Sequence, residues 1–227
     1  MFDVISEQGC RVVSSMYPVL TVNKSVQVEI NNRVPSYTGT WNFSSAGTAS
    51  WGSDIPLSQT MLPPIYSATS PVAFTRGYPI NGNHGWSIYG DIGTVVTLWT
   101  VTPSNSSNIS RYGSGLEVYE ESGRLLWSTN YRAPRLVGLV ESQTGSVPVP
   151  FLPVNHGIMP SVFANVELDV KPYQEYADVL WGSIGYAVVN GNLDRKLVIT
   201  GDSVESTPYA EYNPPLTTCA IFDMSGL

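Results

Sequence analysis

Charged residues are scarce in this chain of 227 residues, and their scarcity narrows the classes of function. Only 13% of the residues are charged, against roughly 25% in an average soluble domain. The net charge is −7, with no run of basic residues, whereas binding to a phosphate backbone requires a basic patch. We therefore expect no nucleic acid among the partners of this protein.

Cysteine is almost absent as well. The two cysteines, Cys10 and Cys219, lie near opposite ends of the chain, which fits neither a metal motif nor a disulfide framework. Free cysteine behaves as a small apolar residue, so we expect two free, partly buried thiols. A disulfide between the first and last strands is the alternative.

Long apolar runs are missing too. No stretch approaches the roughly 20 apolar residues that span a bilayer, so we expect no membrane insertion. The opening MFDVISEQGCRVV also lacks the basic region and the unbroken apolar core of a signal peptide.

Signs of catalysis are few. The HExxH, GxSxG, GxGxxG, P-loop and EF-hand patterns do not occur, so the motif-bearing enzyme classes find no support. The only histidines, His84 and His156, each lie in an Asn-His-Gly triplet. We prefer the interpretation that both triplets form turns, because Asn and Gly favour turns. The alternative is that the two histidines converge on a metal or a substrate. We expect no enzyme, no catalytic residue, no metal and no cofactor.

Helical periodicity is also absent, and short runs rich in β-branched and aromatic residues take its place. Such runs, separated by Gly, Pro and Asn, predict an all-β fold. Predicted strands are 2–6, 10–16, 19–22, 25–31, 38–43, 72–75, 86–90, 94–102, 115–120, 124–129, 135–141, 161–169, 177–181, 185–190, 196–200 and 217–223. Residues 44–71 and 142–160 are rich in Pro, Ser and Thr and are predicted to be surface loops.

The opening of the chain is repeated half a chain later. Residues 2–17, FDVISEQGCRVVSSMY, align without a gap with residues 116–131, LEVYEESGRLLWSTNY, at an offset of 116 − 2 = 114. Each copy predicts a β-hairpin whose corner is completed by a glycine, Gly9 or Gly123, in the left-handed conformation. The repeat predicts two tandem β-sandwich domains, jelly-roll or Ig-like, at residues 1–113 and 114–227, arising by internal duplication.

Tryptophan is comparatively abundant, with six residues, and four of them divide into two groups. Trp99 and Trp127 lie inside predicted strands, so we expect them in the core or at subunit contacts. Trp51 and Trp86 are flanked by glycine and are expected to be exposed. Exposed Trp and Tyr bind sugar rings or protein partners, so Trp51, Trp86 and Tyr89 are the candidate contacts for a glycan or a partner.

The second copy of the hairpin carries a family resemblance. The run 113-GSGLEVYEESGRLLWSTNYRAPRLVG-138 resembles the opening of small structural proteins of tailed-bacteriophage tails. That group has a G-L-x-V-x-[DE/N]-x-x-G-x-L hairpin followed by an R-[LVI]-[LV]-G strand. The matching residues are Gly115, Leu116, Val118, Gly123, Leu125, Arg135, Leu136, Val137 and Gly138.

The resemblance implies a virion component, part of the tail tip or tail fibre, with no catalytic residue to carry over. Partners would be other tail proteins and further copies of this chain, in a trimer or a ring assembled in the host cytoplasm. A low charge suits such broad permanent contacts. The alternative is a carbohydrate-binding adhesin that uses loop aromatics to hold host glycan. A third hypothesis is a glycan hydrolase with paired carboxylates, for which the candidates are Asp54, Asp91, Glu117, Glu120, Glu121, Asp169 and Asp194.

Overall fold

Antiparallel β-strands form the regular structure of the part of the chain that the structure describes. The computed structural model describes residues 3–5, 11–14, 20–59, 62–103, 117–119, 125–128, 134–142, 145–161, 165–172, 176–205 and 217–225. Within these ranges every regular element is a strand, and all paired strands are antiparallel. The prediction of an all-β fold is confirmed.

The described strands alternate between sheets along the chain. The first half contains β1 (Asp3–Ile5), β2 (Arg11–Ser14), β3 (Leu20–Glu29), β4 (Asn32–Arg33), β5 (Ala46–Pro56), β6 (Ile65–Ala68), β7 (Ala73–Ile80), β8 (Asn83–Asp91) and β9 (Val95–Pro103). The second half contains β10 (Glu117–Tyr119), β11 (Leu125–Ser128), β12 (Arg135–Ser142), β13 (Ser146–Pro148), β14 (His156–Pro160), β15 (Asn165–Pro172), β16 (Ala177–Val189), β17 (Asn192–Glu205) and β18 (Thr217–Asp223).

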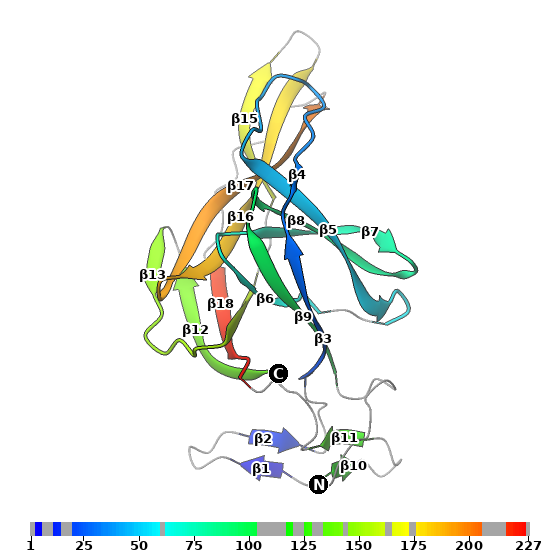
Figure 1. Cartoon of the computed structure of the whole chain (residues 1–227), viewed down its shortest axis with the longest axis vertical. Coiled ribbons are helices and arrows are strands. Elements are labelled where there is room, and N and C mark those ends of the chain that lie inside the picture. Colours follow the sequence, from blue (N-terminus) through cyan, green and yellow to red (C-terminus); the bar gives the residue numbers. More distant parts are fainter. Residues whose placement is uncertain are drawn as a thin grey trace.

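Three large sheets form the body of the molecule (Figure 1). A six-stranded sheet has the order β12-β18-β14-β6-β9-β3, and so takes three strands from each half. Two four-stranded sheets have the orders β4-β5-β8-β7 and β13-β17-β16-β15, each from one half. The hairpins β1-β2 and β10-β11 form two small separate sheets at the same end of the molecule (Figure 1).

The main core is shared by the two halves. Its largest fully buried side chains are Tyr66 on β6, Tyr186 on β16 and Phe74 on β7. The rings of Tyr66 and Phe74 lie 4.7 Å apart, and the Tyr66 hydroxyl donates a hydrogen bond of 3.2 Å to the backbone oxygen of Tyr186. Because a buried hydroxyl needs a partner, this bond fixes one half of the core against the other.

The two small hairpins have the same register. In β1-β2 a bulge falls between Val4 and Ile5, and in β10-β11 a bulge falls between Val118 and Tyr119, which is 114 residues later in each case (118 − 4 = 119 − 5 = 114). The paired residues also correspond at this offset. They are Asp3 with Ser14, Val4 with Val13 and Ile5 with Arg11 in the first hairpin, and Glu117 with Ser128, Val118 with Trp127 and Tyr119 with Leu125 in the second.

The correspondence continues into the six-stranded sheet. β3 pairs with β9 with a bulge between Val22 and Lys24, and β12 pairs with β18 with a bulge between Leu136 and Gly138. Both bulges again differ by 114 residues (136 − 22 = 138 − 24 = 114). The strand order β3-β9-β6 of one edge therefore repeats as β12-β18-β14 at the other, and a single bridge from Ile158 to Tyr66 joins the two sets.

The four-stranded sheets correspond through two Asn-Gly turns. Asn81 and Gly82 connect β7 to β8 with φ angles of 52° and 80°, and Asn190 and Gly191 connect β16 to β17 with φ angles of 50° and 78°. Two successive residues with positive φ are typical of the type I′ hairpin turn. The order β5-β8-β7 in the first half therefore matches β13-β17-β16 in the second. β4 and β15 are the remaining strands, each at an edge of its sheet.

The strand prediction missed parts of this arrangement. Residues 38–43, predicted as a strand, have no strand structure, whereas the predicted loops contain β5, β6, β13 and β14. The predicted pair 177–181 and 185–190 is the single strand β16. β16 continues through the run Gly182-Ser-Ile-Gly185, whose first three residues were left between the two predicted strands. Both glycines are buried, and Cβ atoms there would lie 2.6 Å from Leu168 and Val198 respectively, so they mark close packing.

Candidate functional site: a cavity between the two halves

A segment of the first half is fastened to the second half by side-chain hydrogen bonds. We call residues 36–41, between β4 and β5, the clasp segment. The carboxylate of Asp202 on β17 accepts four hydrogen bonds from it. They come from Ser36 Oγ (2.7 Å), Thr38 Oγ1 (2.7 Å), the Tyr37 backbone N–H (2.6 Å) and the Thr38 backbone N–H (3.3 Å).

Two further aspartates hold the other end of the clasp segment. The Thr40 hydroxyl donates to Asp178 Oδ2 on β16, and Trp41 Nε1 donates to Asp169 Oδ2 on β15 at 3.4 Å. The Lys171 ammonium lies 5.1 Å from the centre of the Trp41 ring, within the range of a cation–π contact. The three neighbouring strands of the second half thus each contribute one carboxylate to the same segment.

The sequence of the clasp segment accounts for its shape. The Gly39 backbone N–H donates to Ser36 Oγ and the Thr40 backbone N–H donates to Thr38 Oγ1, which are the local turns that Ser and Thr favour. Gly39 has a φ of 70°, a conformation that costs other residues energy. Next to the clasp segment, Val34 and Phe43 are buried with Leu180 and Ile199 of the second half packed against them, so apolar burial adds to the hydrogen bonds.

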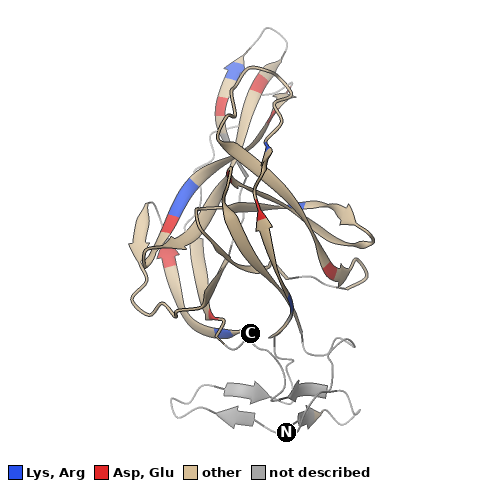
Figure 2. Cartoon of the chain, in the orientation of Figure 1, with Lys and Arg blue, Asp and Glu red and all other residues tan. Residues whose placement is uncertain are grey.

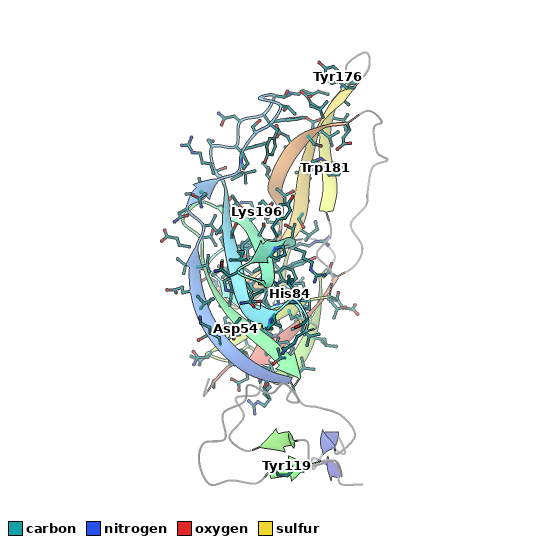
Figure 3. All side chains as sticks on the ribbon, turned by 90° about the vertical axis from the view of Figure 1, so that its right-hand side faces the viewer. Asp54, His84, Tyr119, Tyr176, Trp181 and Lys196 are labelled. Atoms are coloured by element: carbon teal, nitrogen blue, oxygen red, sulfur yellow. The ribbon has the colours of Figure 1, made fainter. Side chains whose placement is uncertain are left out.

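A cavity of about 510 Å³ opens beside the clasp segment. It is lined by residues of the clasp segment, β7, β8, β16 and β17, which are Tyr37, Thr75, Arg76, Tyr89, Trp181, Thr200, Gly201 and Asp202. Three aromatic side chains therefore meet two threonine hydroxyls, a carboxylate and the Arg76 guanidinium. Figure 3 shows Trp181 toward the end of the molecule that carries Tyr176, opposite the end with Tyr119.

The cavity wall carries two charged side chains, the Asp202 carboxylate and the Arg76 guanidinium. Burial alone would raise the pKa of the Asp202 carboxyl, but the hydrogen bonds from Ser36, Thr38 and Tyr37 outweigh burial and hold its pKa below the ordinary value of 3.8. Hydrogen bonds donated to the ionised form stabilise it. Asp202 is therefore an anion at neutral pH, although only 5% of its surface is exposed.

The three predicted contact residues lie in different surroundings. Tyr89 lines the cavity. Trp51 is only 8% exposed and belongs to the main core, so the expectation that its ring is exposed is wrong. Trp86 is half-buried and lies edge-on to Phe74, with ring centres 6.4 Å apart. Trp51 pairs with Trp86 across β5 and β8, and the glycines beside them reflect close strand packing.

Sequence reasoning missed Tyr37 and Trp181. Trp181 lies in a Trp-Gly-Ser triplet like that of Trp51, so the same signal was present. It is half-buried, and its Nε1 donates to Ser203 Oγ at 2.7 Å. Tyr37 lies one residue before the predicted strand 38–43, which overlaps the clasp segment without forming a strand, and 78% of its surface is exposed.

The two histidines have separate environments. His84 is buried on β8, where its Nε2–H donates to the Gln59 backbone oxygen at 2.8 Å and its Nδ1 accepts from Arg76 Nη2 at 3.1 Å. His156 lines a smaller hollow of about 290 Å³ on the six-stranded sheet, together with Trp99, and burial lowers its pKa. The described residues hold no group of three potential metal ligands.

The described part of the chain contains no helix long and apolar enough to cross a bilayer. Comparisons of the chain with protein-family models, with curated proteins and with solved structures find no match.

Proposed function

We propose that this protein is a structural component of a bacteriophage tail, at the tail tip or in a tail fibre, and that it works through assembly with itself and other tail proteins. We further propose that the chain arose by duplication of one sandwich unit, with its halves at residues 1–113 and 114–227. β4 and the clasp segment would be additions to the first copy, and β15 an addition to the second.

One observation carries the proposal of duplication and assembly. The hairpin that bears the resemblance to tail proteins occurs twice, with the same register and the same bulge position. Bulges re-aim strands and are kept as functional features, so a bulge retained in both copies supports a shared role for the two hairpins. Because both lie at one end of the molecule (Figure 1), that end is the proposed site of contact with neighbouring tail proteins.

The surface of the strands supports the same proposal. Figure 2 shows charged residues thinly spread over the described strands, and the ion pair between Lys196 and Asp91 is itself half-exposed. Hydroxyl and aromatic side chains lose water at a lower cost than Lys or Glu, and charged residues are depleted from the cores of permanent interfaces.

The experiment is a measurement of mass and of virion association. The purified chain is expected to give a defined oligomer, a trimer or a ring, by light scattering or analytical ultracentrifugation. Antibodies against the chain should label the tail of the particle that carries its gene. A monomer in solution that is also absent from purified particles would contradict the proposal.

A further inference from the structure

We infer that the cavity between the two halves is a binding site for a neutral saccharide, with Tyr37 and Trp181 against the faces of the sugar and Asp202 accepting a sugar hydroxyl. This site includes one of the three predicted contacts, Tyr89, but neither Trp51 nor Trp86. It is independent of the proposed structural role, since a tail protein can assemble with or without a ligand here.

The first argument concerns the Tyr37 ring. Its backbone N–H is held by Asp202 at 2.6 Å, yet 78% of the residue is exposed. The backbone of Tyr37 is therefore held in place, while its ring lies mostly in water and contributes little to the core. An aromatic ring presented in this way at low entropic cost suits ligand contact, because it offers a large apolar face beside a polar hydroxyl.

The second argument concerns the hydrogen-bonding capacity of Asp202. Its Oδ2 accepts three hydrogen bonds from the clasp segment and its Oδ1 accepts one. Oδ1 thus accepts fewer donors than Oδ2, and because a carboxylate oxygen can accept at least two, Oδ1 can accept one more. A sugar hydroxyl is such a donor, and Thr75 and Thr200 line the same cavity with hydroxyls that both donate and accept.

The third argument is electrostatic and selects a neutral ligand. Asp202 is ionised at neutral pH because of its lowered pKa, and an anion on the wall disfavours carboxylate and phosphate groups. An ammonium ligand would also suit a carboxylate with aromatic rings, but Arg76 lines the same cavity and disfavours a cation. The volume, about 510 Å³, lies in the range of small-molecule sites and exceeds what an ammonium head group fills.

The test is saturation-transfer NMR on the full chain. The probes are methyl glucoside, methyl galactoside, methyl mannoside and N-acetylglucosamine, with glucuronate as the anionic and choline as the cationic control. At least one neutral sugar should receive saturation, and glucuronate and choline should not. Tyr37→Ala should weaken binding of that sugar by about tenfold, as loss of a well-placed aromatic contact does. The substitution keeps the backbone hydrogen bond to Asp202, so the clasp segment should stay in place.

The matched control is Tyr78→Ala. Tyr78 is 92% exposed on β7 and is not among the residues that line the cavity, so its loss should leave sugar binding unchanged. Saturation of none of the neutral sugars, or of choline or glucuronate in their place, would overturn the inference. So would sugar binding that survives Tyr37→Ala, or that falls equally with Tyr78→Ala.

Discussion

The backbone N–H of Tyr37 and the carboxylate of Asp202 form a hydrogen bond of 2.6 Å across 165 residues of sequence. Tyr37 belongs to the clasp segment of the first half and Asp202 to β17 of the second half. Three further hydrogen bonds reach the same carboxylate. This one side chain therefore both joins the halves and forms part of the cavity wall.

Replacing Asp202 should measurably weaken the fold. Asp202→Asn keeps the size of the side chain but removes the charge and half of the acceptor capacity. Hydrogen bonds to a charged group contribute about 1.5–3 kcal/mol each at most, and the donors of the clasp segment can turn to water, so we expect a loss of about 2 kcal/mol in the free energy of unfolding. Urea denaturation measures it.

Asp91→Asn is the control for the loss of unfolding free energy expected in Asp202→Asn. Asp91 pairs with Lys196 at 2.7 Å, with both side chains about half-exposed, and exposed ion pairs contribute roughly 0–1 kcal/mol. Equal destabilisation by the two substitutions would contradict the role assigned to Asp202.

The stability of the protein should depend on pH through the same residue. The pKa of Asp202 is lower in the folded chain than its ordinary value of 3.8, so the unfolded state binds more protons near that pH. Linkage then requires that the stabilisation is present above pH 3.8 and is lost as the pH falls from there through the folded pKa. Unfolding free energies measured over this range should fall more steeply for the wild type than for Asp202→Asn.

Asp223 should contribute to the loss of stability at acid pH in both the wild type and Asp202→Asn. The difference between their pH profiles therefore isolates the contribution of Asp202. Hydrogen bonds from Ser225 above all lower the Asp223 pKa, and this carboxyl is unchanged in the variant. Parallel pH profiles for the wild type and Asp202→Asn would show that Asp202 does not titrate as described.

Cys219 should be unreactive in the folded protein. It is a free, buried thiol, as expected from the sequence, whereas Cys10 lies outside the described residues. Burial raises the pKa of Cys219 to about 12, so only about one thiol in ten thousand is ionised at pH 8, and the thiolate is the nucleophile.

The test uses a chain with Cys10→Ser, so that Cys219 is its single thiol. An aromatic disulfide reagent should label it at least about a hundredfold faster in concentrated urea than under native conditions. Similar rates in the two conditions would show that β18 is not buried as described.

The two Asn-Gly turns should respond alike to substitution. Gly82→Ala and Gly191→Ala each place a Cβ at positive φ, where nothing lies within 4 Å, so the cost is backbone strain alone. We expect each to lose about 1 kcal/mol by thermal or urea denaturation. A large difference between them would argue against the structural equivalence of the two hairpins.

Strands were predicted correctly where an apolar run is bounded by polar residues in the sequence. β18 was predicted with its observed bounds, 217–223, because polar residues surround a continuous apolar run. The duplicated hairpin was found because its residues were retained at a constant offset. β5 was missed because its burial pattern rests on small residues such as Ala46, Ala49 and Ser53, which carry little hydrophobic signal.

The cavity could not be predicted from the sequence for a different reason. Its residues come from positions up to 165 apart, and only tertiary packing brings Tyr37 next to Asp202. Tyr89 was identified because Tyr is a common contact residue. Trp51 was chosen by the same reasoning, but the neighbouring Gly52 leaves room for the Ile80 side chain to pack closely.

The single bridge between Ile158 and Tyr66 decides how this chain can be divided. The backbone scarcely connects the halves of the six-stranded sheet, but the Tyr66 and Tyr186 rings are fully buried in a core that both halves supply. Separating the halves between residues 113 and 114 would break the hydrogen bonds of the clasp segment and would also open that core to water. Neither half alone would therefore keep this core buried. Both halves are needed, either in one chain or as two fragments mixed in solution.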